Sequence, residues 1–330
     1  MRIQGHPTQY ATFDRLTDAK QWANQNDADL KAGRHLPTVE SKRHTLADLI
    51  ERYENTVLLH KKDPRNQQRQ LKWWRERYGK RLLSDITPAL ITEARDTLRE
   101  GERSDSTVNR YMAALSHPFT VASKEWQWIE TNPVLRVSKL KEPRGRVRYL
   151  SDDERNRLLA ACKVSKNPDL LLSVILALST GARKAEIWGS KWEQVDFARE
   201  LIVLHETKNQ ERRVLPIKGR ALELLRDRSK VRSLETDLIF PSKKDPKRPM
   251  DLRAPWELAL NQAQIEDFRW HDLRHSAASY LAMSGATPGE IAAVLGHKTL
   301  QMVKRYAHLS EAHTASVVEK MNKLFISGNA

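Results

Sequence analysis

The residues whose types could do chemistry together lie in the second half of the 330-residue chain. Two arginines, two histidines, one lysine and one tyrosine stand out there: Arg183, Lys208, His271, Arg274, His297 and Tyr306. Arginine binds anions through planar pairs of hydrogen bonds, and histidine exchanges protons near neutral pH. A hydroxyl becomes a nucleophile when a neighbouring group activates it. The set predicts an anion clamp, proton-transferring groups and a hydroxyl nucleophile, and no carboxylate pair, serine nucleophile or metal cage competes with it.

Each of these residues also has a purely structural interpretation when taken alone. Arg183 follows an apolar helix at the edge of the expected core, but a single arginine most often lies at the surface. His271 and Arg274 are three residues apart, so a helix would bring them to one face. His297 alone is typical of a helix cap, and Tyr306 of a half-buried packing residue. Only the combination favours a chemical role.

A zinc site is the alternative interpretation of the two histidines around Arg274. His271 and His275 are four residues apart with an acid after the first, as in the His-Glu-x-x-His pattern of zinc peptidases. Here the acid is the shorter Asp272, and Arg274 between the histidines would repel a divalent cation. The sequence therefore disfavours zinc.

Residues 149–330 are predicted to form a mixed, mostly helical domain with a small antiparallel sheet. Ser151 and Glu154 form a capping box that predicts a helix start, and the apolar stretch 169–178 predicts a central helix. Two short β-type runs, 201–204 and 213–217, surround the polar turn 208–211. They predict a hairpin with Lys208 on its turn, and helices follow from residue 219 to the end.

Residues 40–135 are predicted to form an all-α domain, so the chain as a whole is mainly α. Polar cap residues mark three helix starts, at Thr45, at Thr87 before Pro88, and at Ser104. The third start opens a long helix, and no strand-like alternation appears in this range.

A strongly basic stretch lies within this helical domain. Residues 61–81 hold nine basic and two acidic residues. The spacing of Leu71, Trp74 and Tyr78 predicts one buried helix face, which leaves the cations outward. We take five of them as DNA-binding candidates, with a solvated charged face as the alternative: Lys61, Lys62, Arg65, Arg69 and Lys72.

The range 136–148 is predicted to link the two domains. Its second part contains proline and glycine, lacks an apolar period and is basic through Arg144, Arg146 and Arg148. These arginines could lie along a phosphate backbone, or the segment could be a simple tether. Residues 1–36 are too few to hold a core of their own.

Composition bounds the class of protein. At about 100–200 residues per domain, the length suggests two or three domains. The charge of +15, from 57 basic and 42 acidic residues, favours a polyanion partner. The single cysteine excludes a disulfide framework, and no apolar run reaches the ~18 residues of a membrane span. The first residues lack a signal-peptide core, so we expect a soluble protein of a reducing compartment.

The order of these motifs resembles the phage integrase family of tyrosine recombinases. The matching positions are Thr180, Gly181, Arg183, Glu186 and Ile187, then His271, Leu273, Arg274, His275 and Ser276, then Leu295, Gly296 and His297, and finally Tyr306 and His308. They match in order and spacing across residues 150–308. The helical domain before them resembles the core-binding domain of the same family.

The resemblance implies roles for the six residues. Tyr306 would attack a scissile phosphate and form a 3′-phosphotyrosyl link, which conserves the bond energy, so neither ATP, a metal nor another cofactor is expected. Arg183 and Arg274 would hold the phosphate oxygens. His271 and His297 would hydrogen-bond the phosphate, and His271 would assist deprotonation of Tyr306. Lys208 would protonate the leaving oxygen, a role for which Lys191 and Lys218 are the alternatives.

The resemblance also implies double-stranded DNA as the partner and a homo-tetramer on paired DNA sites. A stripe at the end of the chain, Val317, Val318, Met321, Leu324 and Phe325, is either internal core or a helix donated to another protomer, which the resemblance favours. Residues 1–36 leave room for only part of an arm-binding domain. Integration or excision of a mobile element, such as a prophage or genomic island, is the expected outcome, with DNA-bending accessory proteins as potential partners. The alternatives are a type IB topoisomerase-like relaxase and a non-catalytic DNA-binding regulator.

Overall fold

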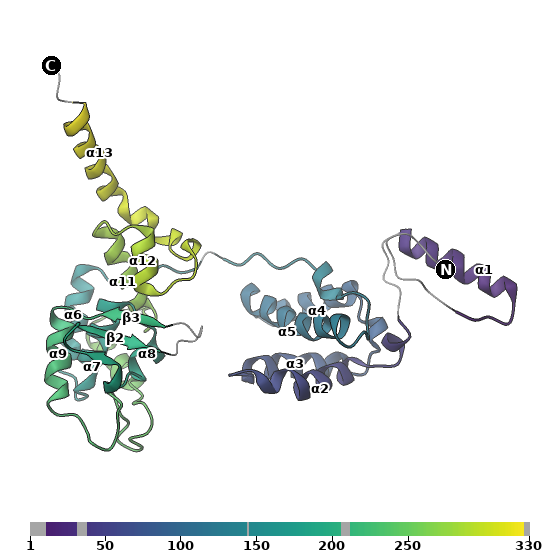
Figure 1. Ribbon diagram of the computed structural model, residues 1–330, viewed down its shortest axis with the longest axis horizontal. Coiled ribbons are helices and arrows are strands. Elements are labelled where there is room, and N and C mark those ends of the chain that lie inside the picture. The colour runs from purple at the N-terminus through teal and green to yellow at the C-terminus, as the bar shows by residue number, and fades with distance from the viewer. Residues whose placement is uncertain (1–10, 32–37, 144, 206–211, 327–330) are drawn as a thin grey trace. The chain divides into compact units, whose positions relative to one another are not determined.

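The computed structural model describes residues 11–31, 38–143, 145–205 and 212–326. The chain divides into two compact units, Met1–Arg144 and Gly145–Ala330, and each is described by itself (Figure 1). Within the described ranges, no helix is both long and apolar enough to cross a membrane.

The first unit is entirely helical over its described residues. Its α-helices are α1 (Leu16–Lys31), α2 (Leu46–Thr56), α3 (Arg65–Tyr78), α4 (Pro88–Glu100) and α5 (Asp105–Lys124), with short 3₁₀ turns between them. The three predicted starts are confirmed, because the side chains of Thr45, Thr87 and Ser104 each accept a hydrogen bond from the backbone N–H three residues on.

The core of this unit lies among α2, α3, α4 and α5. Leu71, Trp74 and Tyr78 of α3 are buried, as the spacing predicted. The Trp74 indole N–H donates to the carbonyl of Tyr111 on α5 at 3.0 Å, which satisfies the one polar group that this large side chain buries.

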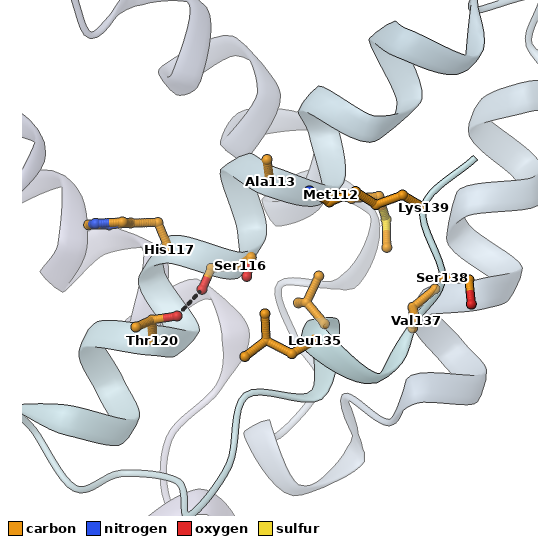
Figure 2. A pocket seen from close by; sticks show the side chains of 10 residues that line it. Met112, Ala113, Ser116, His117, Thr120, Leu135, Val137, Ser138 and Lys139 are labelled. Carbon is orange, nitrogen blue, oxygen red and sulfur yellow. Dashed lines mark hydrogen bonds between the residues drawn. The ribbon is translucent and has the colours of Figure 1, made fainter. Parts of the chain in front are cut away.

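A cavity of about 310 Å³ lies in this unit beside α5 and the segment that follows it (Figure 2). Its lining is mostly apolar, with Met112, Leu135 and Val137 among the contributors. Its one histidine, His117, is already hydrogen-bonded through Nδ1 to Tyr53 Oη at 2.7 Å. The cavity also borders Ser116, Thr120, Ser138 and Lys139, but none of the six predicted reactive residues lines it.

The second unit is mostly helical with one small sheet, which confirms the predicted fold class. Its helices are α6 (Asp152–Lys163), α7 (Asp169–Thr180), α8 (Lys184–Trp188), α9 (Arg220–Ser229), α10 (Arg253–Gln262), α11 (Asp272–Met283), α12 (Pro288–Leu295) and α13 (Glu311–Phe325). Three antiparallel strands, β1 (Val195–Asp196), β2 (Leu201–Leu204) and β3 (Arg213–Pro216), lie in the order β1-β2-β3. The two-residue β1 was not predicted, because so short a strand has no measurable alternation.

Helix α7 is the centre of this unit. Most of its apolar residues are buried, including Leu170, Val174 and Leu176, and it packs against α6, α9 and α11. A helix that is apolar on most of its surface is stable only when other elements cover it. The packing of α11 against α7 brings the predicted arginines of two motifs to one place.

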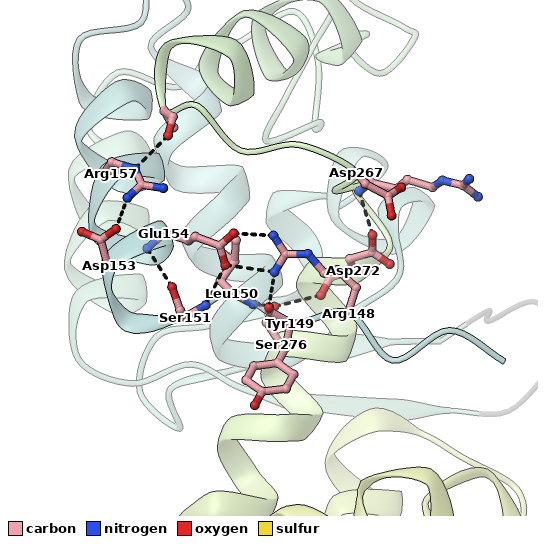
Figure 3. Close-up of polar contacts among 12 residues, drawn as sticks. Arg148, Tyr149, Leu150, Ser151, Asp153, Glu154, Arg157, Asp267, Asp272 and Ser276 are labelled. Atoms are coloured by element: carbon pink, nitrogen blue, oxygen red, sulfur yellow. Dashed lines mark hydrogen bonds and ion pairs between the residues drawn. The ribbon is translucent and has the colours of Figure 1, made fainter. Parts of the chain in front are cut away.

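The segment that enters the second unit is fastened to it by polar contacts (Figure 3). Arg148 Nη1 donates to Glu154 Oε2 of α6 at 2.9 Å, and Arg146 Nη2 donates to Asp272 Oδ2 of α11 at 2.9 Å. The Leu150 backbone N–H donates to Ser276 Oγ at 3.0 Å. The start of this unit is therefore held against the helix that carries His271 and Arg274.

These contacts revise the expectation for the linker arginines. Arg146 also pairs with Asp267, so both Arg146 and Arg148 have carboxylate partners within their own unit. A paired guanidinium offers less charge to a phosphate backbone than the free cation that the sequence suggested. Arg144 lies outside the described residues, and DNA contact by the three arginines stays a prediction.

Candidate active site

Arg274 is the most deeply buried cation of the site. It lies in the first turn of α11 with only 4% of its surface exposed, and Nη1 donates to the Gly181 carbonyl at 2.6 Å. Burial lowers its pKa to about 10, and the charges of Arg213 and Arg183 act in the same direction. A guanidinium held this way keeps its remaining N–H donors in a fixed direction.

Gly181 provides the carbonyl that holds Arg274. It ends α7 in the left-handed conformation, with φ of 59°, which glycine adopts without strain. A Cβ on this residue would lie 2.3 Å from Leu295 Cδ2 of α12. The absence of a side chain is therefore what allows α7, α11 and α12 to meet at this point.

We expect Gly181→Ala to lower the free energy of unfolding by about 2–4 kcal/mol, since it adds left-handed strain to a steric overlap. Urea unfolding measures this loss. The control is Gly289→Ala in the first turn of α12, where the nearest atom would be 4.0 Å away and φ is not positive. The control should be neutral or stabilising by about 0.4–1 kcal/mol, and equal losses in both variants would contradict the packing argument.

Arg183 is positioned by the carboxylate of Glu186, whose side chain is 10% exposed. Its backbone N–H and Nη1 both donate to Glu186, at 2.8 Å each. Arg213 of β3 donates to the same carboxylate at 2.8 Å and to the Val294 carbonyl at 2.6 Å. Burial lowers the pKa of Arg213, while the charge of Glu186 opposes that shift. One carboxylate thus fixes two arginines, and no role was predicted for Glu186 or Arg213 from the sequence.

His297 follows the end of α12 and carries an unpaired buried nitrogen. Gly296 turns the chain with φ of 64° directly over Arg213, where a Cβ would meet the arginine Cδ at 2.7 Å. His297 Nδ1 is buried and has no hydrogen-bond partner in the structure. Burial, together with nearby arginines, lowers its pKa to about 4. A buried polar atom without a partner is costly, which favours a ligand that completes the site.

Tyr306 lies in the 3₁₀ segment η7 (Lys304–Ser310) and is only 2% exposed. It belongs to a buried apolar cluster that includes Leu295 and Val303, and its hydroxyl is 2.5 Å from Nδ1 of His275. Burial raises the pKa of Tyr306, and the charges of Arg305 and Arg274 partly offset the rise.

These side chains line one cavity of about 120 Å³. The lining residues are Arg183, His271, Arg274, His275, His297, Met302, Arg305 and Tyr306. Five of the six predicted residues therefore meet, although the motifs that hold them are far apart in the sequence. None of the lining residues is acidic, so the cavity is built for an anion. The roles assigned to the individual residues stay predictions.

The structure does not describe Lys208, which falls in the undescribed range 206–211. Its two alternatives are placed elsewhere. Lys191 pairs with Glu193 at 3.1 Å, and Lys218 pairs with Glu200. Neither lines the cavity, so the proton donor stays a prediction that rests on Lys208.

Besides Met302, two lining residues of the cavity were not predicted to take part in the reaction. Arg305 precedes the tyrosine, and a basic residue beside a tyrosine gives no signal of its own. His275 was considered as a zinc ligand and as a position of the family motif, but it was given no role in the reaction. Its ring lies 5.3 Å from that of His271 in an edge-on arrangement and contacts Tyr306. Among the described residues, no group of three or more His, Cys, Asp or Glu side chains is placed to hold a metal ion.

The candidate DNA-binding cations lie before and along α3 of the first unit, and all five side chains are exposed. Arg65 pairs with Asp63 at 2.9 Å, and Lys72 lies 3.7 Å from Glu76. Lys61 donates to Tyr53 Oη at 3.0 Å, which ties its ammonium group to the core. Such exposed pairs are weak, so they leave most of this charge available to a polyanion.

The sequence matches the phage integrase family over residues 148–313 and the N-terminal domain of phage integrases over residues 42–141. It is 31% identical to the shufflon-specific DNA recombinase of Escherichia coli over 293 residues, which are 83% of this chain and 71% of that protein. It is 28% identical to the integrase of Salmonella phage P22, with 62% of this chain and 54% of that protein covered. It is 33% identical to the integrase of Haemophilus phage HP1, with 67% of this chain and 60% of that protein covered. The chain thus spans little more than half the length of the two phage proteins.

The fold has solved counterparts. The Tn1549 transposon integrase in complex with a circular intermediate DNA matches with a TM-score of 0.70 at 17% identity, over 84% of this chain and 99% of that chain. A lambda integrase tetramer bound to a Holliday junction matches with a TM-score of 0.64 at 21% identity, over 90% of this chain and 88% of that chain. At these identities the likeness establishes the fold.

Proposed function

The chain belongs to the phage integrase family, and from that premise we propose that the cavity around Tyr306 cleaves and rejoins DNA strands through a 3′-phosphotyrosyl intermediate. The chain is a tyrosine-type site-specific recombinase of the integrase kind. The observation that carries the proposal is the meeting of a buried tyrosine hydroxyl with three arginines and three histidines in a cavity without an acidic lining residue.

The proposed reaction exchanges one phosphodiester bond for another. Tyr306 Oη forms a bond to the scissile phosphorus while the P–O5′ bond breaks, and the 5′ oxygen leaves as a hydroxyl. The reverse attack by a 5′ hydroxyl reseals a strand, so the cycle requires neither ATP nor a metal. Lys208 is proposed to protonate the leaving oxygen.

Arg183 and Arg274 are proposed to bind the non-bridging oxygens of the phosphate. Charge develops on these oxygens in the pentavalent transition state, and donors already fixed in place stabilise it without reorganising. Glu186 and the Gly181 carbonyl provide that fixation. His271 and the unpaired His297 Nδ1 are proposed as further hydrogen-bond partners of the phosphate.

The test is a nicked duplex that traps cleavage. Its sequence is taken from duplexes selected for binding from a random pool, and the readout is a covalent protein–DNA adduct. We expect an adduct, and strand exchange when two sites are supplied. An adduct without exchange between sites would favour a relaxase, binding without any adduct would favour a regulator, and loss of activity to a chelator would favour a metal enzyme.

The match to integrases favours the recombinase over the relaxase and the regulator. We propose that the chain integrates or excises a mobile element in the bacterial cytoplasm, which the similarity to two phage integrases supports. DNA-bending accessory proteins are potential further partners. An arm-binding role for residues 1–36 stays a prediction, and residues 1–10 and 32–37 lie outside the described ranges.

We propose that the exposed face of α3 grips duplex DNA without reading its sequence. We expect the triple variant Arg65→Gln, Arg69→Gln, Lys72→Gln to weaken binding to all duplexes. The slope of log K against log salt should fall by about 2–3, since each phosphate contact contributes about 0.9. Fluorescence anisotropy at several salt concentrations measures both quantities.

The matched control removes three exposed cations from the second unit, with the substitutions Lys163→Gln, Lys230→Gln and Lys244→Gln. It lowers the net charge by the same amount but leaves α3 intact. If the two triple variants change the slope equally, net charge rather than α3 determines the grip, and the proposed surface is wrong.

We propose that α13 packs against a second copy of the chain in the tetramer. Its apolar stripe is exposed, from 45% at Met321 to 81% at Phe325, so it does not serve as internal core in this structure (Figure 1). The resemblance to the family and the match to a DNA-bound lambda integrase tetramer support a partner protomer as its cover.

We expect Met321→Glu with Leu324→Glu to abolish the tetramer on paired sites but to preserve single-site cleavage, because buried carboxylates would oppose packing against a partner. Sedimentation of the protein–DNA complex measures assembly. The control is Lys320→Glu on the same helix, which reverses a charge outside the stripe. Full assembly in the double variant would contradict the proposal.

A further inference from the structure

His271 at the N-cap of α11 and His275 within α11 both line the cavity, and Tyr306 contacts His275. The Nδ1 atom of His275 is 2.5 Å from Tyr306 Oη, and the two ring centres are 6.0 Å apart. His271 precedes the helix one turn earlier and contacts the edge of the His275 ring. The contact with the reacting oxygen therefore differs from the one that the family resemblance implied, which gave this proton to His271.

The surroundings keep the His275 ring neutral. Burial lowers its pKa to about 4, and the nearby positive charges of Arg274 and Arg305 act in the same direction. The groups that face it are His271, Asp272 and Arg274 from its own helix and helix cap, and Arg305 and Tyr306 from η7. A neutral imidazole has one nitrogen that accepts a hydrogen bond, and in the tautomer protonated on Nε2 this nitrogen is Nδ1, which lies 2.5 Å from the tyrosine hydroxyl.

Tyr306 needs such a partner. Its ring is buried, and burial raises the pKa of its hydroxyl above the usual value of about 10. The free phenolate is therefore scarce near neutral pH, and attack on phosphorus requires that the proton leave as the new bond forms.

We propose that His275 is the general base of the cleavage step and accepts the phenolic proton of Tyr306 on Nδ1. This inference rests on the proposed function. The Oη–H bond breaks and its proton forms a bond with Nδ1, while Oη bonds to phosphorus and the P–O5′ bond breaks. In the resealing step the imidazolium returns the proton to the departing Tyr306 oxygen. His271 is then free to bind the phosphate.

The negative charge of a bound phosphate strengthens the base. An anion within a few ångströms favours the protonated form of an imidazole, so the ring accepts a proton more readily in the complex than in free protein. A bound phosphate thus promotes deprotonation of Tyr306 by His275. Cleavage without a correctly bound scissile phosphate is therefore disfavoured.

The test compares His275→Ala and His275→Asn with wild type in single-turnover cleavage of the nicked duplex. We expect both to lower the rate by about 10²–10³-fold, which is typical of a lost general base. An asparagine oxygen can still accept a hydrogen bond from Tyr306 but cannot take its proton. A wild-type rate in His275→Asn would therefore show that His275 only positions Tyr306, and it would overturn the assignment of His275 as the general base.

The pH profile separates the base from a structural role. We expect the wild-type rate to be level between about pH 6 and 9, because the base is already unprotonated there. In His275→Ala the rate should rise about tenfold per pH unit, since hydroxide must replace the base. Added imidazole should restore part of the rate of the alanine variant, and a level profile without rescue would contradict the proposal.

A sulfur atom at the 5′ leaving position gives a further control. A thiolate leaves without a proton donor, so this substrate rescues a lost acid but not a lost base. We expect the defect of His275→Ala to persist and that of Lys208→Ala to disappear. Rescue of His275→Ala by sulfur would assign the histidine to the leaving group and overturn the inference.

Failure of this inference is distinguishable from failure of the proposed function. If wild type forms no adduct, the proposed function itself fails. If wild type forms adduct and His275→Ala cleaves at the same rate, only the assignment of the base fails. Urea unfolding and duplex binding of each variant establish that a lost rate does not reflect a lost fold.

Discussion

Tyr306→Phe is expected to abolish the covalent protein–DNA adduct and to leave duplex binding unchanged. Without Oη no bond to phosphorus can form, so the loss should be complete to the detection limit of the gel. The measurement is adduct formation on the nicked duplex with protein in excess, followed over hours.

The structure indicates that this variant folds. Tyr306 belongs to a buried apolar cluster with Leu295 and Val303, and phenylalanine keeps an aromatic ring in that cluster. The change removes one hydrogen bond, to His275, at a cost of about 1–3 kcal/mol. The lost adduct would therefore report chemistry rather than unfolding.

Tyr280→Phe is the matched control, since it removes the same atom from another tyrosine of the second unit. Its hydroxyl donates to the Leu150 carbonyl at 2.9 Å and does not line the cavity. We expect normal adduct from this variant. Persistent adduct in Tyr306→Phe would assign the nucleophile to another residue and overturn the central proposal.

The second large effect is expected from Arg274. Its side chain is buried, lines the cavity and is held by the Gly181 carbonyl, so its position is fixed before a phosphate binds. We expect Arg274→Ala to lower the single-turnover rate by about 10³–10⁵-fold, the range of an arginine that stabilises phosphoryl-transfer charge. Arg274→Lys should recover little of this, because an ammonium group cannot hold the carbonyl and two phosphate oxygens together.

Folding has to be measured alongside the rate. Loss of Arg274 leaves the Gly181 carbonyl without its donor, so Arg274→Ala should also lose about 1–3 kcal/mol of folding stability. Rates are therefore compared at a temperature where urea unfolding shows each variant to be folded. Arg226→Ala, which removes an exposed arginine, should cleave normally. A loss of less than about tenfold in Arg274→Ala would contradict a transition-state role.

The sequence alone predicted much of the fold, because helix signals are local. The polar caps at Thr45, Thr87, Ser104 and Ser151 each act within a few residues of the start that they mark. The spacing of hydrophobic residues in α3 and the apolar run of α7 determined which faces are buried. A strand of two residues carries no such signal, so β1 became visible only through its pairing with β2.

The packing of distant segments decided what the sequence did not. Arg213 supports Arg183 only because β3 lies beside α8 and α12, where one carboxylate reaches both guanidinium groups. Arg146 and Arg148 read as free cations in the sequence but find carboxylates of the second unit. Each contact joins residues that have no periodic relation, so no pattern along the chain could predict it.

The types, order and spacing of the reactive residues were determined by the sequence, and they indicate a phosphotyrosine reaction and the family that performs it. Only the tertiary structure decided that His275, rather than His271, contacts Tyr306 Oη. Both histidines lie on one side of α11, one turn apart, and the sequence treats them alike. The docking of η7 against α11 selects between them, because it sets which ring nitrogen lies within hydrogen-bonding distance of the buried hydroxyl.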